Sequence, residues 1–145
     1  FDDTKLENVN EQILTQSKDV GEIIELFNTV LNTVSYDNYP ISSEAVVQQL
    51  LYMYLKGICN SVTAELHSSK GRADLVVESD IRRIVFEFKY AQNETEAKAK
   101  LSEAVEQIKT RDYGNILPKK HELLRIAAVF NADPKVRAFT EYLEV

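Results

Sequence analysis

Two acidic residues and one lysine lie inside two neighbouring apolar runs of the sequence. Asp74 belongs to the run 71–77, and Glu87 and Lys89 belong to the run 84–89. Successive side chains of a strand point to opposite faces of the sheet. If both runs are strands, Glu87 and Lys89 share one face, while the phenylalanines between them share the other.

The spacing of the two runs predicts where these side chains meet. A turn centred on Asp80-Ile81 would pair 73–78 with 83–90 as an antiparallel hairpin and set Asp74 directly opposite Glu87. Cross-strand neighbours lie about 4.5–5.5 Å apart at Cβ. Two carboxylates at this distance suit a hard cation such as Mg²⁺, and an ammonium group beside them can neutralise charge on a phosphate. We expect a patch that water and a cation can reach.

Composition bounds the class of protein. The chain has 145 residues, of which 44% are hydrophobic, and this length suits one domain with a core. It contains no apolar run of the roughly 18–20 residues that a membrane span needs, and we expect no secretory signal. The single Cys59 excludes an internal disulfide and fits a reducing cytoplasm. The balance of 17 basic against 23 acidic residues, a net charge of −6, argues against strong non-specific adhesion to nucleic acid.

The hydrophobic pattern predicts the elements that must position the site. Apolar residues at helical spacing indicate helices within the first sixteen residues, from an N-cap at Asp19 to about residue 34, in 43–57 and in 94–112. A loop is expected at 35–42. Strands are predicted at 62–67, in the hairpin, and at 124–130, whose continuous apolar run is typical of burial on both faces. The tail 136–145 is either an edge strand or a short helix. This order predicts an α/β fold with a mixed sheet.

The motifs of the chain resemble those of the PD-(D/E)xK nuclease superfamily. The resemblance, closest to a nuclease-like domain found in prokaryotic AAA-ATPase-like proteins, covers nearly the whole chain. It is carried by Glu44, Glu65, Gly71-Arg72-Ala73-Asp74-Leu75, Val85-Phe86-Glu87-Phe88-Lys89, Ala104-x-x-Gln107-Ile108 and Tyr113. It implies a restriction-endonuclease-like core with the order α-β-β-β-α-β, a central mixed sheet and flanking helices. The core would span 43–145, with 1–42 as a helical extension packed on it.

The resemblance also implies a metal site. Asp74, Glu87 and the backbone carbonyl of Phe88 would hold Mg²⁺ or Mn²⁺, and Lys89 would assist catalysis. Glu65 is a candidate for a further metal ligand. Glu44 and Gln107 would be auxiliary, although the place of Glu44 in the first turn of a helix is almost equally explained by the helix dipole. His67 shares strand parity with Glu65, so it is either a further side chain at the site or, as we prefer, an ordinary strand-end side chain.

Four residues are candidates for contact with substrate. Arg72 lies beside the acidic pair, and Gln107 shares a helix flank with Lys100 and Arg111. Tyr113 follows this helix. Related exonuclease-like members carry the tyrosine four residues after the glutamine, where this chain has Arg111 and places its tyrosine two residues later, at Tyr113. The proline of the superfamily name is replaced by Ala73, which costs no ligand.

Three functions remain open from the sequence. The first is a Mg²⁺-dependent phosphodiesterase that hydrolyses DNA, and less readily RNA, as part of a protein with an ATPase-like domain, with a homodimer as one possible assembly. The second is a nuclease-like fold that no longer cuts and acts as a nucleic-acid- or protein-binding regulatory module beside the ATPase. The third is a plain interaction domain in which Asp74, Glu87 and Lys89 form a structural ion pair.

Overall fold

A computed structural model describes residues 11–33, 41–58, 63–69, 72–111 and 122–145. For residues 44, 58, 63–69, 72–74 and 110–111 it describes the backbone alone. The elements follow in the order α2 (Val20–Asn32), α3 (Glu44–Ile58), β1 (Thr63–Ser69), β2 (Arg72–Glu78), β3 (Arg82–Ala91), α4 (Glu94–Arg111), β4 (Glu122–Asn131) and β5 (Ala138–Glu144). The predicted α/β class and order of elements are confirmed.

Helix α2 begins where the sequence predicts. The carboxylate of Asp19 accepts a hydrogen bond from the backbone N–H of Gly21 at 2.9 Å, which satisfies a donor that the helix itself leaves unpaired. The helix buries residues at the predicted spacing, among them Ile23, Phe27 and Leu31. Residues 11–16 are also helical. The remainder of the first predicted helix and most of the loop predicted at 35–42 lie outside the described residues.

The strands form one five-stranded sheet in the order β1-β2-β3-β4-β5. Strands β1, β2 and β3 are antiparallel neighbours, β4 runs parallel to β3, and β5 runs antiparallel to β4. A parallel pair requires a crossover connection, and α4 lies in that connection. Because β5 comes last in the strand order, the tail forms an edge strand, which is the first of the two structures that its pattern allows. Of the run 124–130 that is predicted to be buried, Leu124 and residues 126–130 are buried, whereas Arg125 is half-buried.

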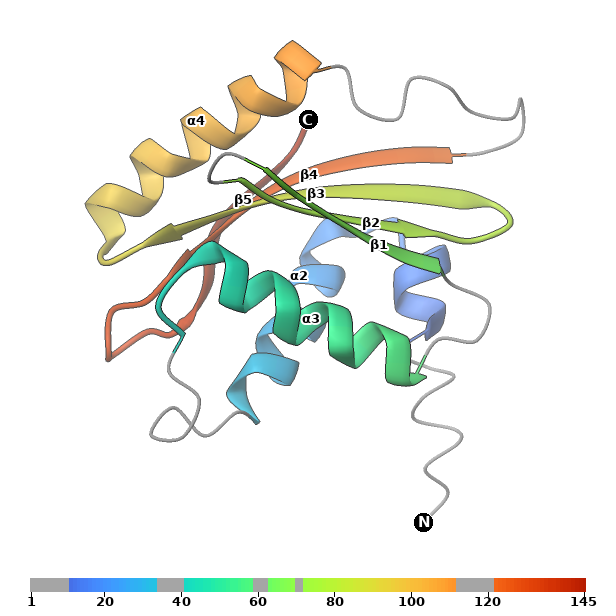
Figure 1. Ribbon diagram of the computed structural model, residues 1–145, viewed down its shortest axis with the longest axis horizontal. Helices are drawn as coiled ribbons and strands as arrows, with labels where there is room; N and C mark the ends of the chain where they lie inside the picture. The colour runs from blue at the N-terminus through green and yellow to red at the C-terminus, as the bar shows by residue number, and fades with distance from the viewer. Residues whose placement is uncertain (1–10, 34–40, 59–62, 70–71, 112–121) are drawn as a thin grey trace.

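Helices cover both faces of the sheet, with α4 on one side and α2 and α3 on the other (Figure 1). The face beneath α2 and α3 is aromatic. The rings of Phe86 and Phe88 are stacked at 5.6 Å, and Phe27 of α2 packs 5.1 Å from Phe86. The contact between α4 and the sheet is made by smaller residues, with Ala97, Ala104 and Ile108 on the helix and Ala91, Ala127 and Val129 on the strands. Helices with small side chains at a contact can approach closely.

A buried arginine ties the starts of the two central strands together. Arg82 opens β3, and its Nη2 atom lies 3.3 Å from Oε2 of Glu122, the first residue of β4. Its Nη1 donates to the backbone carbonyl of Leu14 at 3.4 Å. This fixes the helical segment 11–16 against the end of the sheet. In the part of the chain that the structure describes, no helix has the length and apolar character needed to cross a membrane.

Candidate active site

The β2–β3 hairpin brings two acidic positions together. Asp74 is the Cα partner of Glu87 in the antiparallel pair. The turn between the strands is closed by a hydrogen bond of 2.8 Å from the backbone N–H of Ser79 to the carbonyl of Arg82. Directly opposed residues share a face of the sheet, so the predicted register and the shared face of Asp74 and Glu87 are confirmed.

The face that carries Glu87 and Lys89 is the face that α4 covers. Glu87 is 0% exposed and Lys89 is 5% exposed. The prediction of a patch open to water is therefore wrong for these two residues. The physical reason is the small size of the residues beneath the helix, since Ala104 packs on Ala127 and Ala97 packs near Ala91, which lets α4 lie close to β3 and β4.

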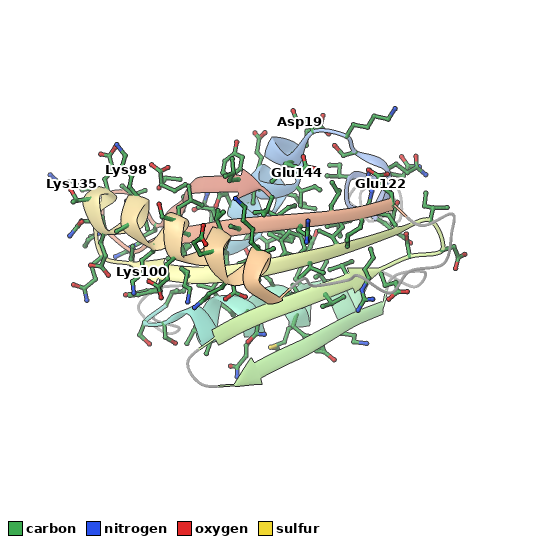
Figure 2. All side chains as sticks on the ribbon, turned by 90° about the horizontal axis from the view of Figure 1, so that it is seen from above. Asp19, Lys98, Lys100, Glu122, Lys135 and Glu144 are labelled. Carbon is green, nitrogen blue, oxygen red and sulfur yellow. The ribbon has the colours of Figure 1, made fainter. Side chains whose placement is uncertain are left out.

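Lys89 reaches the flank of α4 and forms an ion pair there. Its Nζ lies 3.5 Å from Oε1 of Glu103, and Oε2 of the same carboxylate lies 3.5 Å from Nζ of Lys100. Figure 2 shows Lys100 on the side of α4 toward β3 and β2, and Lys98 on the opposite side of the helix. Sequence reasoning missed Glu103. The available signal was its spacing, because Lys100, Glu103 and Gln107 follow one another at i, i+3 and i+7 on one flank.

Gln107 extends this flank by one turn. It is half-buried, and its Oε1 is buried without a hydrogen-bond partner among the described residues. A buried polar atom without a partner costs about 1–3 kcal/mol, so the described residues alone leave this oxygen poorly satisfied. Because Ala104 and Ile108, on either side of it, are fully buried, Gln107 lies at the border between the packed stripe of α4 and the polar flank.

The register of β1 adds two residues to the same face. His67 is the Cα partner of Asp74, and Glu65 is the partner of Val76, two positions further along β2. Across three neighbouring strands, His67, Asp74 and Glu87 therefore occupy one row. Spacing along the chain does not reveal which residue of β2 His67 opposes, so the sequence alone favours an ordinary strand-end side chain.

The pattern of elements and this row of residues agree with a comparison against protein families. The sequence profile of the PD-(D/E)XK nuclease superfamily matches residues 42–140. The chain belongs to the PD-(D/E)XK nuclease superfamily. No curated protein matches the chain. The matched range includes the β2–β3 hairpin, the crossover helix α4 and strand β4.

Some of the predicted site residues have a described backbone but no described side chain. Arg72 opens β2, Glu44 opens α3, Arg111 ends α4, and Glu65 lies within β1. Their side chains, and that of Asp74, lie outside the description, so the roles expected for them stay predictions. Tyr113 lies wholly outside the described residues.

The hairpin residues fit a divalent cation, which nucleases of the superfamily generally use. Asp74 and Glu87 occupy opposed positions, and carboxylate and backbone carbonyl oxygens are the ligands of hard cations. The burial of Glu87 strengthens its attraction to a cation, since the effective dielectric constant is lower away from water. Among the side chains that the structure describes, no group of three or more His, Cys, Asp or Glu gathers. The side chains of Asp74, Glu65 and His67 are not among those described.

Proposed function

We propose that this domain is a metal-dependent phosphodiesterase that hydrolyses DNA. The observation that carries the proposal is the β2–β3 register, in which Asp74 opposes Glu87 while Lys89 shares their face, within a chain of the PD-(D/E)XK nuclease superfamily. In the reaction, a water oxygen bonds to phosphorus, one phosphorus–oxygen ester bond breaks, and the released oxygen takes up a proton.

The proposed ligands of Mg²⁺ or Mn²⁺ are Asp74, Glu87 and the backbone carbonyl of Phe88, with Glu65 as a further candidate and Glu44 in an auxiliary role. When bound, the cation would lower the pKa of a water molecule and stabilise negative charge on the phosphate. Glu87 is the best placed of these ligands to be held rigidly, because its strand is the central one and its side chain is fully buried.

The other motif residues act on the water and the substrate. Lys89 orients the attacking water or pairs with the phosphate that is cleaved, which places positive charge where negative charge develops. Arg72, Gln107, Arg111 and Tyr113 are the proposed contacts to the nucleic acid backbone. Contacts to phosphates fix the register of a nucleic acid on a protein without reading its sequence.

A binding module that does not cut is the second candidate, and one observation favours it. Glu87 is closed off from solvent, and Lys89 is engaged by Glu103. In this alternative the fold binds nucleic acid or protein and regulates an ATPase-like domain of the same full-length protein. For both candidates we propose a helical extension in 1–42 on a core in 43–145, a cytoplasmic location, and a homodimer as one possible assembly.

A cleavage assay tests the proposal. Plasmid and linear DNA are incubated with the protein in Mn²⁺ or in EDTA, alongside Asp74→Asn and Lys89→Ala. Lys98→Ala is the matched control, because it breaks an ion pair of similar length, to Glu94, on the far flank of α4. We expect nicking that needs Mn²⁺, persists in Lys98→Ala and is lost in the two site variants. Equal nicking by all variants, or no nicking by the unaltered protein, would reject the proposed enzyme activity.

A further inference from the structure

One carboxylate bridges two lysines at the edge of the site. The Oε1 atom of Glu103 lies 3.5 Å from Nζ of Lys89, and its Oε2 atom lies 3.5 Å from Nζ of Lys100. Lys89 belongs to β3, whereas Lys100 lies one turn before Glu103 on α4. The cluster of these three residues therefore joins the central strand to the polar flank of the helix.

The three members of the cluster differ in their access to water. The side chain of Lys89 is 7% exposed, that of Lys100 is 38% exposed, and that of Glu103 is 47% exposed. The carboxylate thus lies at the surface and reaches inward to a buried ammonium group. An incoming anion meets Glu103 and Lys100 before it can meet Lys89.

A second ion pair on α4 shows what is particular about this cluster. Glu94 and Lys98 also lie 3.5 Å apart, but both are well exposed, and they are i, i+4 neighbours on the helix surface. Such an exposed pair contributes little to the stability of the fold. Glu103 instead pairs with Lys89 of strand β3, the lysine proposed to assist catalysis.

A carboxylate and a phosphodiester group have similar chemistry toward two ammonium groups. Each presents two oxygens that share one negative charge, and each accepts charge-assisted hydrogen bonds from lysine. We propose that Lys89 and Lys100 form a phosphate subsite that Glu103 occupies when no nucleic acid is bound. A phosphate of the substrate then displaces the Glu103 carboxylate from both lysines. This inference rests on the proposed function, because it assumes that the ligand of the site is nucleic acid.

The displacement makes Glu103 an internal competitor of the substrate. Binding must break two ion pairs before the lysines can contact a phosphate, so the carboxylate lowers the affinity for any nucleic acid. Removal of its charge, with the shape of the side chain retained, should raise the affinity. The same change at Glu94 alters the net charge equally but frees no lysine of the site.

Binding of a fluorescein-labelled duplex oligonucleotide, measured by fluorescence anisotropy in EDTA, tests the inference. We expect Glu103→Gln to bind about three- to fivefold more tightly than the unaltered protein, the factor by which breaking an exposed ion pair shifts an equilibrium. Glu94→Gln should bind as the unaltered protein does. Thermal denaturation of each variant checks that it is folded.

Lys100→Gln in the otherwise unaltered chain provides a second reading that does not depend on the folding of Glu103→Gln. It should bind more weakly than Lys98→Gln, and the slope of log K against log salt should be smaller by about 0.9, as expected for one lost phosphate contact.

Each contrary outcome overturns the inference. Equal or weaker binding by Glu103→Gln than by Glu94→Gln would show that the carboxylate does not compete with phosphate. Absence of binding by every variant would show that the two lysines do not take up a phosphate. EDTA removes metal and prevents cleavage, so the binding assay does not depend on enzyme activity. If the chain binds as expected but never nicks plasmid, this inference stands and the proposed enzyme activity is rejected. If the chain nicks plasmid but Glu103→Gln has no effect on binding, the proposed enzyme activity stands and this inference is rejected.

Discussion

The two faces of the sheet carry different kinds of residue from the same strand. On β3, Phe86 and Phe88 point to α2 and α3, where they pack in a cluster of phenylalanine rings. The alternate residues Glu87 and Lys89 point to α4, whose contact with the sheet consists largely of alanine. The aromatic face can therefore supply most of the burial that stabilises the fold, while the alanine-lined face leaves room for charged groups beside its packed stripe.

The largest expected effect is on the aromatic face. Phe86→Ala should lower the free energy of unfolding by about 3–5 kcal/mol, because it removes a fully buried ring and leaves a cavity. Urea denaturation followed by circular dichroism measures the change. A loss below about 1 kcal/mol would mean that the aromatic face is not where the stability of the domain lies.

The second effect tests how closely α4 approaches the sheet. Ala104→Leu should cost about 1–3 kcal/mol, because the added atoms do not fit between the helix and Ala127. Ala99→Leu is the matched control on an exposed position of the same helix, and it should change the free energy of unfolding by less than about 0.5 kcal/mol. If both variants are equally stable, α4 is not closely packed on this face, and the burial of Glu87 needs another cause.

The residues changed in these two variants show which features of the fold could be predicted from the sequence. The alternation of phenylalanines with Glu87 and Lys89 predicted the two faces, and the hairpin register followed from a short turn, which is a local property. The tail 136–145 could not be decided, because its weak alternation fits an edge strand and a short helix about equally. An edge strand has a neighbour on one side only, so burial constrains its sequence less.

The burial of Glu87 and the residues around it could not be predicted from the sequence, for a different reason. The distance between α4 and the sheet depends on facing residues from separate elements, such as Ala104 and Ala127. The alanines at positions 97 and 104 of the predicted apolar stripe were the available sign of a close approach. The helix flank of Glu103 could be read from its spacing to Lys100 and Gln107, but its pairing with Lys89 could not, because no spacing along the chain relates a helix residue to a strand residue.

A third effect concerns how the helices of the aromatic face hold the edge strand. The side-chain amide of Asn28 in α2 accepts from the backbone N–H of Phe139 at 2.7 Å and donates to its carbonyl at 3.2 Å. Asn28→Ala should cost about 1–2 kcal/mol, because it leaves these two backbone groups of β5 without their partner. Thr29→Ala is the control, since that exposed side chain bonds only within its own helix. The same denaturation assay compares the two, and equal stabilities would show that α2 does not fasten β5.

The smallest expected effect is at the polar cluster. Glu103→Gln should change the free energy of unfolding by less than about 1 kcal/mol, because Glu103 is half-exposed and such ion pairs stabilise weakly. Urea denaturation decides this as well. A loss near that of Phe86→Ala would show that Lys89 and Glu103 are a structural ion pair, and the contrast between a stabilising face and a chemical face would fail.

The most direct test of the account is calorimetric titration of the folded domain with Mn²⁺. If the α4 face is a metal-dependent site, the unaltered protein and the Glu94→Gln control should bind the ion, and Asp74→Asn and Glu87→Gln should each abolish binding while the domain stays folded. Binding that is unchanged in both site variants, or absent from the unaltered protein, would contradict a metal centre between β2 and β3.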